Sequence, residues 1–213
     1  KDLSIQVKGK SFLDLGCGLG GLCRQVQKMG ATNIYGVEIE PFKLDFAKKN
    51  CMNIPQVNIS YLDVDYTDRF FNTLDLIVAD QVMEHVKNPN NFASFISNSL
   101  NHNGLAFIGL PNGFSIENVL SEPHLAIPLI SLMPSKSAAI FAEKIAGHKH
   151  YAEMMGPRYL KHTEILNIFR SVGLEASFCS SIPSVEELHK KRDSFISEIG
   201  LIKKSLLESN DFD

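Results

Sequence analysis

The chain has 213 residues, of which 44% are hydrophobic and 21% are charged. A chain of this length and apolar content builds its own core, which excludes the disordered and collagen-like classes and predicts one domain over residues 1–213. Its 21 Lys and Arg residues against 24 Asp and Glu residues leave a net charge of −3, so the basic surplus of a duplex nucleic-acid binder is missing.

Short apolar runs alternate with segments of helical periodicity between residues 10 and 110. The runs predict strands at residues 11–15, 33–38, 57–62, 74–79 and 105–110. The segments between them predict helices at residues 21–29, 41–50 and 91–100. Pro41 suits the first turn of its helix, where a missing N–H is harmless. This alternation predicts an α/β fold, with a Rossmann-like, doubly wound and mostly parallel sheet covered by helices on both faces.

Residues 111–160 interrupt the alternation after the fifth predicted strand. An αβ connection normally takes about 2–6 residues, whereas this segment has about 50. It contains two apolar stretches, 125–133 and 138–146, with Pro134 between them. We interpret the segment as a helical lid inserted into the domain, and a second face of the core is the alternative. A helix at 161–172 and a strand near 174–179 follow.

The last part of the chain, residues 185–206, carries apolar side chains at three- and four-residue spacing. Arg192 interrupts this amphipathic stripe. Packing on the sheet or on the lid is the first interpretation, and a contact within a homodimer is the second.

The cysteines and the apolar segments bear on the compartment of the protein. No pair among Cys17, Cys23, Cys51 and Cys179 has the spacing of a zinc knuckle or of a redox motif, which favours reduced thiols in a cytoplasmic protein. The apolar stretch 125–133 is about half as long as a membrane span, and the first residues lack the apolar segment of a signal peptide. We therefore expect no transmembrane segment.

The densest functional signal is the segment FLDLGCGLGG at residues 12–21, where the first predicted strand meets the first predicted helix. Glycines at 16, 18 and 20 let the backbone turn tightly and let a ligand approach the main chain. The spacing from Gly16 to Gly21 also fits the dinucleotide fingerprint G-x-G-x-x-G. The glycines alone therefore leave the cofactor open.

Two acidic residues beside these glycines narrow the choice of cofactor. Asp14 lies two residues before the first glycine, where it would repel a pyrophosphate and attract an ammonium or sulfonium group. Glu38 ends the second predicted strand about 20 residues later, where a carboxylate can accept both ribose hydroxyls. Glu38 suits NAD as well, so Asp14 is the residue that favours a cationic cofactor.

With these residues the chain resembles the class I S-adenosylmethionine-dependent methyltransferases of the small-molecule type, which act on ubiquinone precursors or saccharides. Residues 14–20 are similar to the family's first motif, residues 36–41 to its ribose-binding segment and residues 61–65 to the segment that contacts adenine. The resemblance implies that S-adenosylmethionine and its product S-adenosylhomocysteine bind here. The residues that it implies for this contact are Asp14, Gly16, Cys17, Gly18, Gly20, Glu38, Ile39, Asp63, Val64 and Asp80.

Candidate residues for contacting the methyl acceptor, or for removing its proton, follow the fourth predicted strand and lie in the predicted lid. Glu84-His85 is similar to a pair found in ubiquinone-biosynthesis O-methyltransferases, which implies that His85 acts as a base or lines the pocket while Glu84 orients it. A histidine that only caps a helix is the alternative. In the lid, His150 and Tyr151 are candidates for contacting the acceptor. The resemblance implies in-line methyl transfer to an oxygen of a small-molecule or carrier-linked acceptor.

Three other functions remain as alternatives. Metal-dependent RNA 2′-O-methyltransferases carry Glu-x-x-Glu-His at this point, but Gln81 replaces the first acid here and an amide is a poor ligand for a hard cation, so we expect no metal. An NAD-type dehydrogenase is disfavoured by Asp14 and by the lack of a second nucleotide-binding half after the fifth strand. A module that binds S-adenosylmethionine without catalysis stays open.

Overall fold

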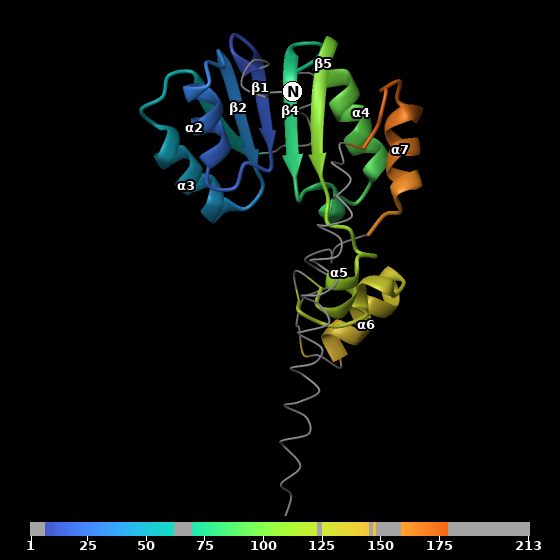
Figure 1. The fold of residues 1–213 in the computed structure, drawn as a ribbon. Coiled ribbons are helices and arrows are strands. Elements are labelled where there is room, and N and C mark those ends of the chain that lie inside the picture. Colours follow the sequence, from blue (N-terminus) through green and yellow to red (C-terminus); the bar gives the residue numbers. More distant parts are fainter. Residues whose placement is uncertain (1–6, 62–69, 123–124, 145–146, 148–158, 179–213) are drawn as a thin grey trace, which may run out of the picture. The chain divides into compact units, whose positions relative to one another are not determined.

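The computed structural model of the chain describes residues 7–61, 70–122, 125–144, 147 and 159–178 (Figure 1). The chain divides into two compact units, Lys1–Ala176 and Ser177–Asp213. Only residues 177 and 178 of the second unit are described, so the predicted stripe at 185–206 lies outside the described residues. Among the described residues, no helix has the length and apolar character needed to cross a membrane.

The first unit is built on a parallel sheet of five strands in the order β3-β2-β1-β4-β5. The strands are β1 Ser11–Leu15, β2 Asn33–Glu38, β3 Val57–Tyr61, β4 Leu74–Asp80 and β5 Leu100–Gly109. The order reverses between β1 and β4, and ligands of open α/β sheets bind beyond the carboxyl ends of the strands at such a switch point. The sheet confirms the predicted fold class.

Helices cover both faces of this sheet. On one face lie α2 Gly21–Lys28 and α3 Pro41–Cys51, and on the other lie α4 Pro89–Ser99 and α7 His162–Ser171. The other helices are η2 Met83–His85, which follows β4, and α5 Ile116–Leu120, η3 Ile130–Leu132 and α6 Ser135–Lys144, which lie in the segment after β5. Figure 1 shows α2 and α3 beside β2 and β1, and α4 and α7 beside β5. Alternate residues of one strand serve opposite faces, since Phe12 packs in a cluster with Cys23 of α2 whereas Leu13 packs in a cluster with Ile96 of α4 and Phe169 of α7.

The fifth strand begins five residues earlier than its apolar run predicts. Leu100 pairs with Leu74 and Leu105 pairs with Leu76, so the residues between them form an irregularity inside the strand and not a turn before it. A Cβ at Gly104 would lie 2.8 Å from the carbonyl oxygen of Leu74, which explains the glycine at this point. The early pairing depends on the neighbouring strand and has no signal in the local sequence.

The strand predicted near 174–179 is wrong for the residues that the structure describes, because residues 174–178 are not in a strand. Gly173 has a φ of +84° and ends α7. The Leu174 N–H then donates to the Phe169 carbonyl at 3.2 Å, and Arg170 donates to the Ala176 carbonyl at 3.0 Å. These bonds hold the segment against the end of its own helix.

The inserted segment after β5 is helical in its described part, as predicted, and contains α5, η3 and α6. A small core of its own consists of Ile127, Ile130, Ala138 and Ala142 and is separate from the two clusters that pack on the sheet. Glu122, only 1% exposed, accepts hydrogen bonds from the Leu125 N–H at 2.7 Å and from the Tyr159 hydroxyl. Whether the segment closes over a site as a lid stays a prediction.

Candidate functional site

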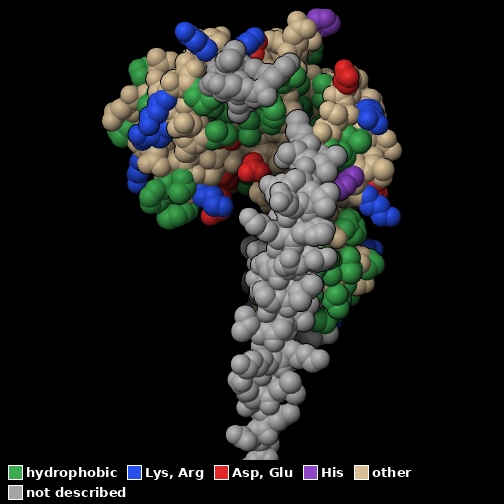
Figure 2. Space-filling view, in the orientation of Figure 1, with side chains coloured by type: hydrophobic (Ala, Val, Ile, Leu, Met, Phe, Trp, Pro, Cys, Tyr) green, Lys and Arg blue, Asp and Glu red, His purple; other side chains and the backbone are tan. Residues whose placement is uncertain are grey.

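Three acids lie at the carboxyl ends of neighbouring strands. Asp14 comes from β1, Glu38 from β2 and Asp80 from β4. Parallel register aligns Asp14 with Gly36 and Val78, so the ends of these strands meet at one edge of the sheet. Figure 2 shows acidic side chains at the lower end of the sheet, where the strand arrows of Figure 1 end. Asp14 and Glu38 are buried, whereas Asp80 is exposed.

The Asp14 carboxylate is short of hydrogen-bond donors. Among the described residues its hydrogen bond comes from the Cys23 thiol, with 3.7 Å between the sulfur and Oδ2. Burial raises the pKa of Asp14 to about 6; the Cys23 bond opposes this shift, and the negative charges of Asp80 and Glu38 add to it. A buried carboxylate in this state is stabilised by a cation placed next to it.

Three free thiols pack behind the glycine loop. Cys17, Cys23 and Cys51 are 7%, 0% and 3% exposed, and they belong to the cluster between the sheet and helices α2 and α3. A hydrogen bond with Cys17, together with burial, raises the pKa of the Cys23 thiol, so it remains a thiol and donates to Asp14. The prediction that Cys23 and Cys51 are small core residues is confirmed.

Glu38 ties the glycine loop to the end of β2. Its Oε2 accepts from the Gly18 N–H at 2.9 Å, and its Oε1 accepts from the N–H groups of Ile39 at 2.8 Å and Glu40 at 2.9 Å. A carboxylate has about four lone-pair sites, so these three bonds leave capacity for a hydroxyl donor. Ile39 is 56% exposed beside it and offers an apolar surface.

The loop glycines are required by backbone conformation, since Gly16, Gly18 and Gly20 have φ values of +83°, +54° and +79°. A Cβ at Gly16 would lie 2.5 Å from a methyl group of Val82, while a Cβ at Gly18 would meet nothing within 4 Å. Gly18 therefore presents its backbone to open space. This loop, together with the acids around it, fits a ligand that has ribose hydroxyls and a cationic tail.

The turn after β4 has an unusual backbone. Gln81 has a φ of +56°, in the left-handed region, and its N–H donates to the Gly109 carbonyl at 3.0 Å. In η2, which follows, Nε2 of the half-buried His85 lies 3.9 Å from Oε1 of the buried Glu84. Nothing in the local sequence signals the conformation of Gln81.

The structure thus brings the predicted residues Asp14, Gly16, Gly18, Gly20 and Glu38 together, with Asp80 at the same edge of the sheet. Asp63, Val64, His150 and Tyr151 lie outside the described residues. Their predicted contacts stay predictions. Within the ranges that the structure describes, no group of three or more His, Cys, Asp or Glu side chains is placed to hold a metal ion.

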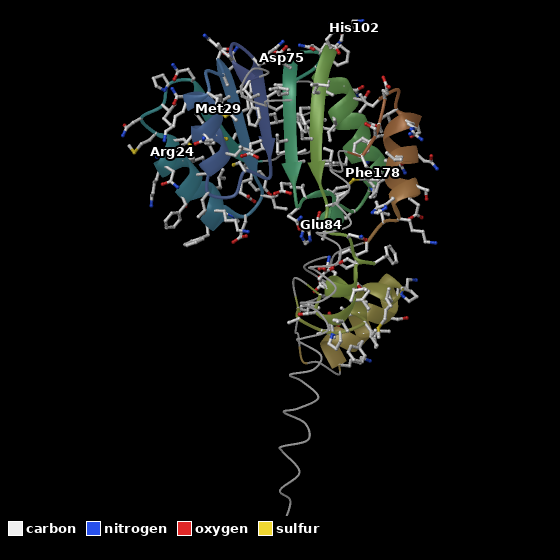
Figure 3. All side chains as sticks on the ribbon, in the orientation of Figure 1. Arg24, Met29, Asp75, Glu84, His102 and Phe178 are labelled. Carbon is white, nitrogen blue, oxygen red and sulfur yellow. The ribbon has the colours of Figure 1, made fainter. Side chains whose placement is uncertain are left out.

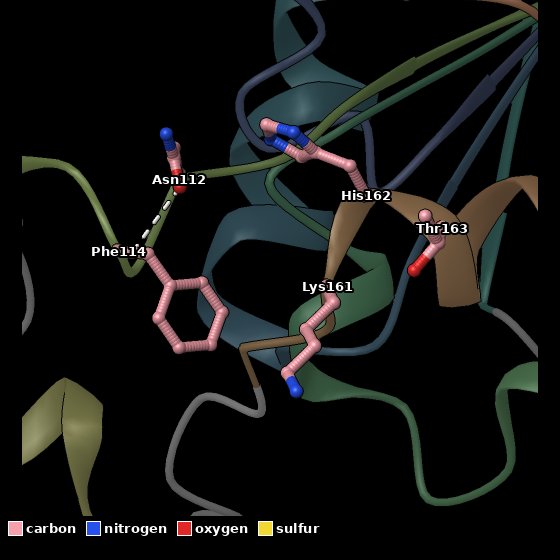
Figure 4. Close-up of a pocket in the computed structure, with 5 residues that line it drawn as sticks. All are labelled: Asn112, Phe114, Lys161, His162 and Thr163. Atoms are coloured by element: carbon pink, nitrogen blue, oxygen red, sulfur yellow. Dashed lines mark hydrogen bonds between the residues drawn. The ribbon is translucent and has the colours of Figure 1, made fainter.

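A cavity that the sequence did not indicate lies beyond β5. It has a volume of about 410 Å³ and is lined by Asn112, Phe114, Lys161, His162 and Thr163 (Figure 4). Its two walls, the turn after β5 and the start of α7, are separated by almost 50 residues in the sequence. The Pro111-Asn112-Gly113 turn is the only local signal there, and it indicates a turn without indicating a site.

Comparison with known sequences gives one consistent result. The model of a family described as "Methyltransferase domain" matches residues 2–176. The mitochondrial ubiquinone biosynthesis O-methyltransferase of Dictyostelium discoideum is 25% identical over 122 residues, which are 52% of this chain and 38% of that protein. The ubiquinone biosynthesis O-methyltransferase of Coxiella burnetii is 34% identical over 87 residues, 40% of this chain and 36% of that protein. The matches thus span less than half the length of these curated relatives.

Among solved structures, the chain is similar to the phosphoethanolamine N-methyltransferase 2 of Haemonchus contortus in complex with S-adenosyl-L-methionine. The TM-score is 0.57 with 18% sequence identity, and the match covers 96% of this chain and 41% of that one. At this identity the likeness supports the fold alone, and it agrees with the parallel sheet described above.

Proposed function

The chain belongs to the methyltransferase-domain family, in agreement with its resemblance to class I S-adenosylmethionine-dependent methyltransferases, and from this premise we propose that it methylates an oxygen of a small-molecule or carrier-linked acceptor. The observation that carries the proposal is the buried Asp14, with its raised pKa, beside a glycine loop whose Gly18 faces open space. The names of the matched relatives, which are O-methyltransferases, support an oxygen as the methylated atom.

Asp14 and Glu38 divide the binding of the cofactor between them in this proposal. Asp14 attracts the cationic methionine end of the cofactor, because a positive charge offsets the energetic cost of burying the ionised carboxylate. Glu38 accepts a hydrogen bond from a ribose hydroxyl with its remaining lone pair while it holds the loop through Gly18. Ile39, Asp63 and Val64 are proposed to surround the adenine, as the resemblance implies. When bound, S-adenosylmethionine supplies an electrophilic methyl group.

The protein must then position the acceptor and remove a proton. We propose that His85 removes this proton from the acceptor. His85 is half-buried after β4, and Glu84 lies near its Nε2 and can orient the ring. His150 and Tyr151 are proposed as acceptor contacts from the 111–160 insertion, which we propose acts as a lid within one domain. Water excluded by such a lid cannot compete for the methyl group.

The proposal also covers the compartment, the kind of acceptor and the oligomeric state. Three free buried thiols support a reducing compartment, for which we propose the cytoplasm. A net charge of −3 supports a small acceptor over a nucleic acid. Homodimerisation is an open part of the proposal and is tested by the molar mass in solution.

Calorimetry on the full chain tests the cofactor. We expect S-adenosylmethionine and S-adenosylhomocysteine to bind and NAD to give no signal. Glu38→Ala should weaken cofactor binding by about 1–3 kcal/mol, because it removes a charge-assisted hydrogen bond to the ribose. Tight binding of NAD with no signal from S-adenosylmethionine would contradict the proposal. A screen with radiolabelled methyl donor then identifies the acceptor.

A further inference from the structure

We propose that the cavity between the turn after β5 and the start of α7 receives an anionic group of the methyl acceptor, a carboxylate or a phosphate monoester. The ring or chain that carries the anion would lie against Phe114. This assignment rests on the proposed function, since it names the chemical class of that acceptor. It concerns Asn112, Phe114, Lys161, His162 and Thr163, which line the cavity.

The first reason is the place of the cavity on the chain. Gly109, the last residue of β5, pairs in register with Asp80, and a Cβ at Gly109 would collide with the Asp80 carboxylate. Asn112 follows three residues later, and three residues span at most about 10 Å. One wall of the cavity therefore begins within about 10 Å of the strand end that lies beside Asp80.

The second reason is the chemistry of the lining. The Asn112 amide oxygen accepts from the Phe114 N–H at 3.1 Å, so the amide NH₂ is the end that can donate to a ligand (Figure 4). Lys161 adds a positive charge, and Thr163 adds a hydroxyl that can donate. The described lining contains no carboxylate. Such a set of donors favours an acceptor that carries a negative charge.

The charge of Lys161 is not cancelled by its described surroundings. No ion pair joins its ammonium group to a carboxylate in the part of the chain that the structure describes. The nearest acid in the sequence, Glu164, accepts the backbone N–H of Lys161 at 2.8 Å at the start of α7. The lining thus has the opposite charge to the Asp14 edge, so that the cofactor's cation and the acceptor's anion are drawn to different places.

The third reason is size and rigidity. The pocket is open at the surface, since the five side chains that line it are all exposed, and its volume of about 410 Å³ lies in the range of small-molecule sites, roughly 300–1,000 Å³. Phe114 is 47% exposed and offers a flat apolar surface for a ring or a methylene chain. Gly113 is buried, and a Cβ there would collide with the Tyr159 ring, so the two walls touch through Tyr159. The Tyr159 hydroxyl donates to Glu122, which fixes the contact further.

Binding by the full chain, saturated with S-adenosylhomocysteine, tests this proposal by backbone amide NMR. The probes are 3,4-dihydroxybenzoate, its neutral methyl ester, phenyl phosphate and inorganic phosphate. We expect at least one aryl anion to shift the amides of residues 112–114 and 161–163 and to bind more than tenfold more tightly than the ester. Lys161→Gln should weaken the binding of that anion about tenfold to a hundredfold and leave the affinity for the ester unchanged. Lys28→Gln, which removes an exposed cation from α2, is the matched control and should change nothing.

Three results would overturn the assignment: no shift at these amides with either aryl anion, equal affinity for acid and ester, or inorganic phosphate binding as tightly as the aryl anions. The last result would indicate a general anion site and no acceptor pocket. Calorimetry with S-adenosylhomocysteine on the same samples separates this inference from the proposed function. Normal cofactor binding without shifts at the pocket amides would contradict only the proposed acceptor class. Absence of cofactor binding would contradict the proposed function. In that case the probes are tested on the cofactor-free chain.

Discussion

Asp14 and Asp75 are carboxylates of the same sheet, and their surroundings are opposite. Asp75 lies near the amino end of β4 and accepts from Ser11 N–H at 2.8 Å, Ser11 Oγ at 3.0 Å, Asn101 Nδ2 at 2.7 Å and Lys10 Nζ at 3.3 Å. Burial alone would raise the pKa of Asp75, yet these donors lower it to about 2. Asp14, near the carboxyl end of β1, has a thiol as its described donor and a pKa of about 6.

Figure 3 labels Asp75 at the upper end of the sheet and Glu84 at the lower end, where β4 leads into η2. The two ends of the sheet thus differ in how they treat a carboxylate. The amino edge satisfies its charge within the protein, so that charge stabilises the fold. At the carboxyl edge the protein leaves the charge of Asp14 poorly solvated, and in the proposed function the cation of the cofactor supplies the missing partner.

The largest effect is expected from Asp14→Asn. Cofactor affinity should fall about a hundredfold or more, because a buried charge pair with the cationic ligand is lost. The variant should nevertheless be about 1–3 kcal/mol more stable than the wild type at pH 8. The folded pKa of Asp14 is raised, so its ionisation destabilises the fold as the pH rises from about 4 through about 6.

Calorimetry and urea unfolding at pH 8 and pH 4 measure both effects of Asp14→Asn, and the gain in stability should disappear near pH 4. Asp45→Asn, which changes an exposed carboxylate of α3, is the control for both measurements. A variant that is less stable than the wild type at pH 8 would contradict the assignment of a destabilising charge to Asp14.

Asp75→Asn should show the reverse pattern. Its free energy of unfolding should fall by about 2 kcal/mol, because an amide replaces an acceptor of four hydrogen bonds, while cofactor affinity stays unchanged. The pKa of Asp75 is lowered, so the stability that it contributes is present above pH 4 and is lost as the pH falls toward 2. The difference in urea midpoint between variant and wild type should therefore shrink on acidification. Loss of cofactor binding in a folded Asp75→Asn protein would contradict the separation.

The affinity for the cofactor should depend on pH through Asp14. A cation is bound by the ionised form of Asp14, so affinity should rise with pH until the pH exceeds about 6. Between pH 5 and pH 7 this amounts to about tenfold, or about 1.4 kcal/mol. Calorimetry with S-adenosylmethionine at several pH values measures the slope, which Asp14→Asn should remove. An equally steep slope in the variant would assign the titration to another group.

The smallest effect concerns two glycines with a similar conformation. Gly9 precedes β1 and Gly18 follows it, with φ values of +73° and +54°, and a Cβ at either would meet nothing within 4 Å. Gly9→Ala and Gly18→Ala should each destabilise the fold by about 1 kcal/mol through strain. Only Gly18→Ala should also weaken cofactor binding, by about tenfold, since its methyl group would occupy the open space. Equal binding by the two variants would place the cofactor elsewhere.

Local sequence was sufficient to predict most of the sheet. The first two strands end at the residues where the apolar runs end, because Gly16 and Pro41 mark the following turn and helix. The start of β5 could not be predicted, since Leu100 joins the sheet only through its pairing with Leu74. A strand was expected after α7, and backbone bonds at the end of that helix replace it.

The sequence indicated which residues of the candidate site lie at the strand ends, but it did not indicate the raised pKa of Asp14. The spacing of Asp14, the glycines and Glu38 indicated the cofactor, because these residues lie at or directly after the carboxyl ends of recognisable strands. The raised pKa of Asp14 depends partly on Asp80, which is 66 residues away and is brought near only by the pairing of β1 with β4. The cavity beyond β5 depends in the same way on two distant segments.

The separate core of the inserted segment has a consequence for how such a protein diversifies. Ile127, Ile130, Ala138 and Ala142 pack with one another and belong to neither cluster on the sheet. We expect substitutions in this small core to perturb the segment more than the sheet and its glycine loop, because the two share no buried cluster. With the acceptor-binding role that we propose for this segment, selection for a new acceptor would act on a part of the chain whose core is separate from the core that carries the glycine loop.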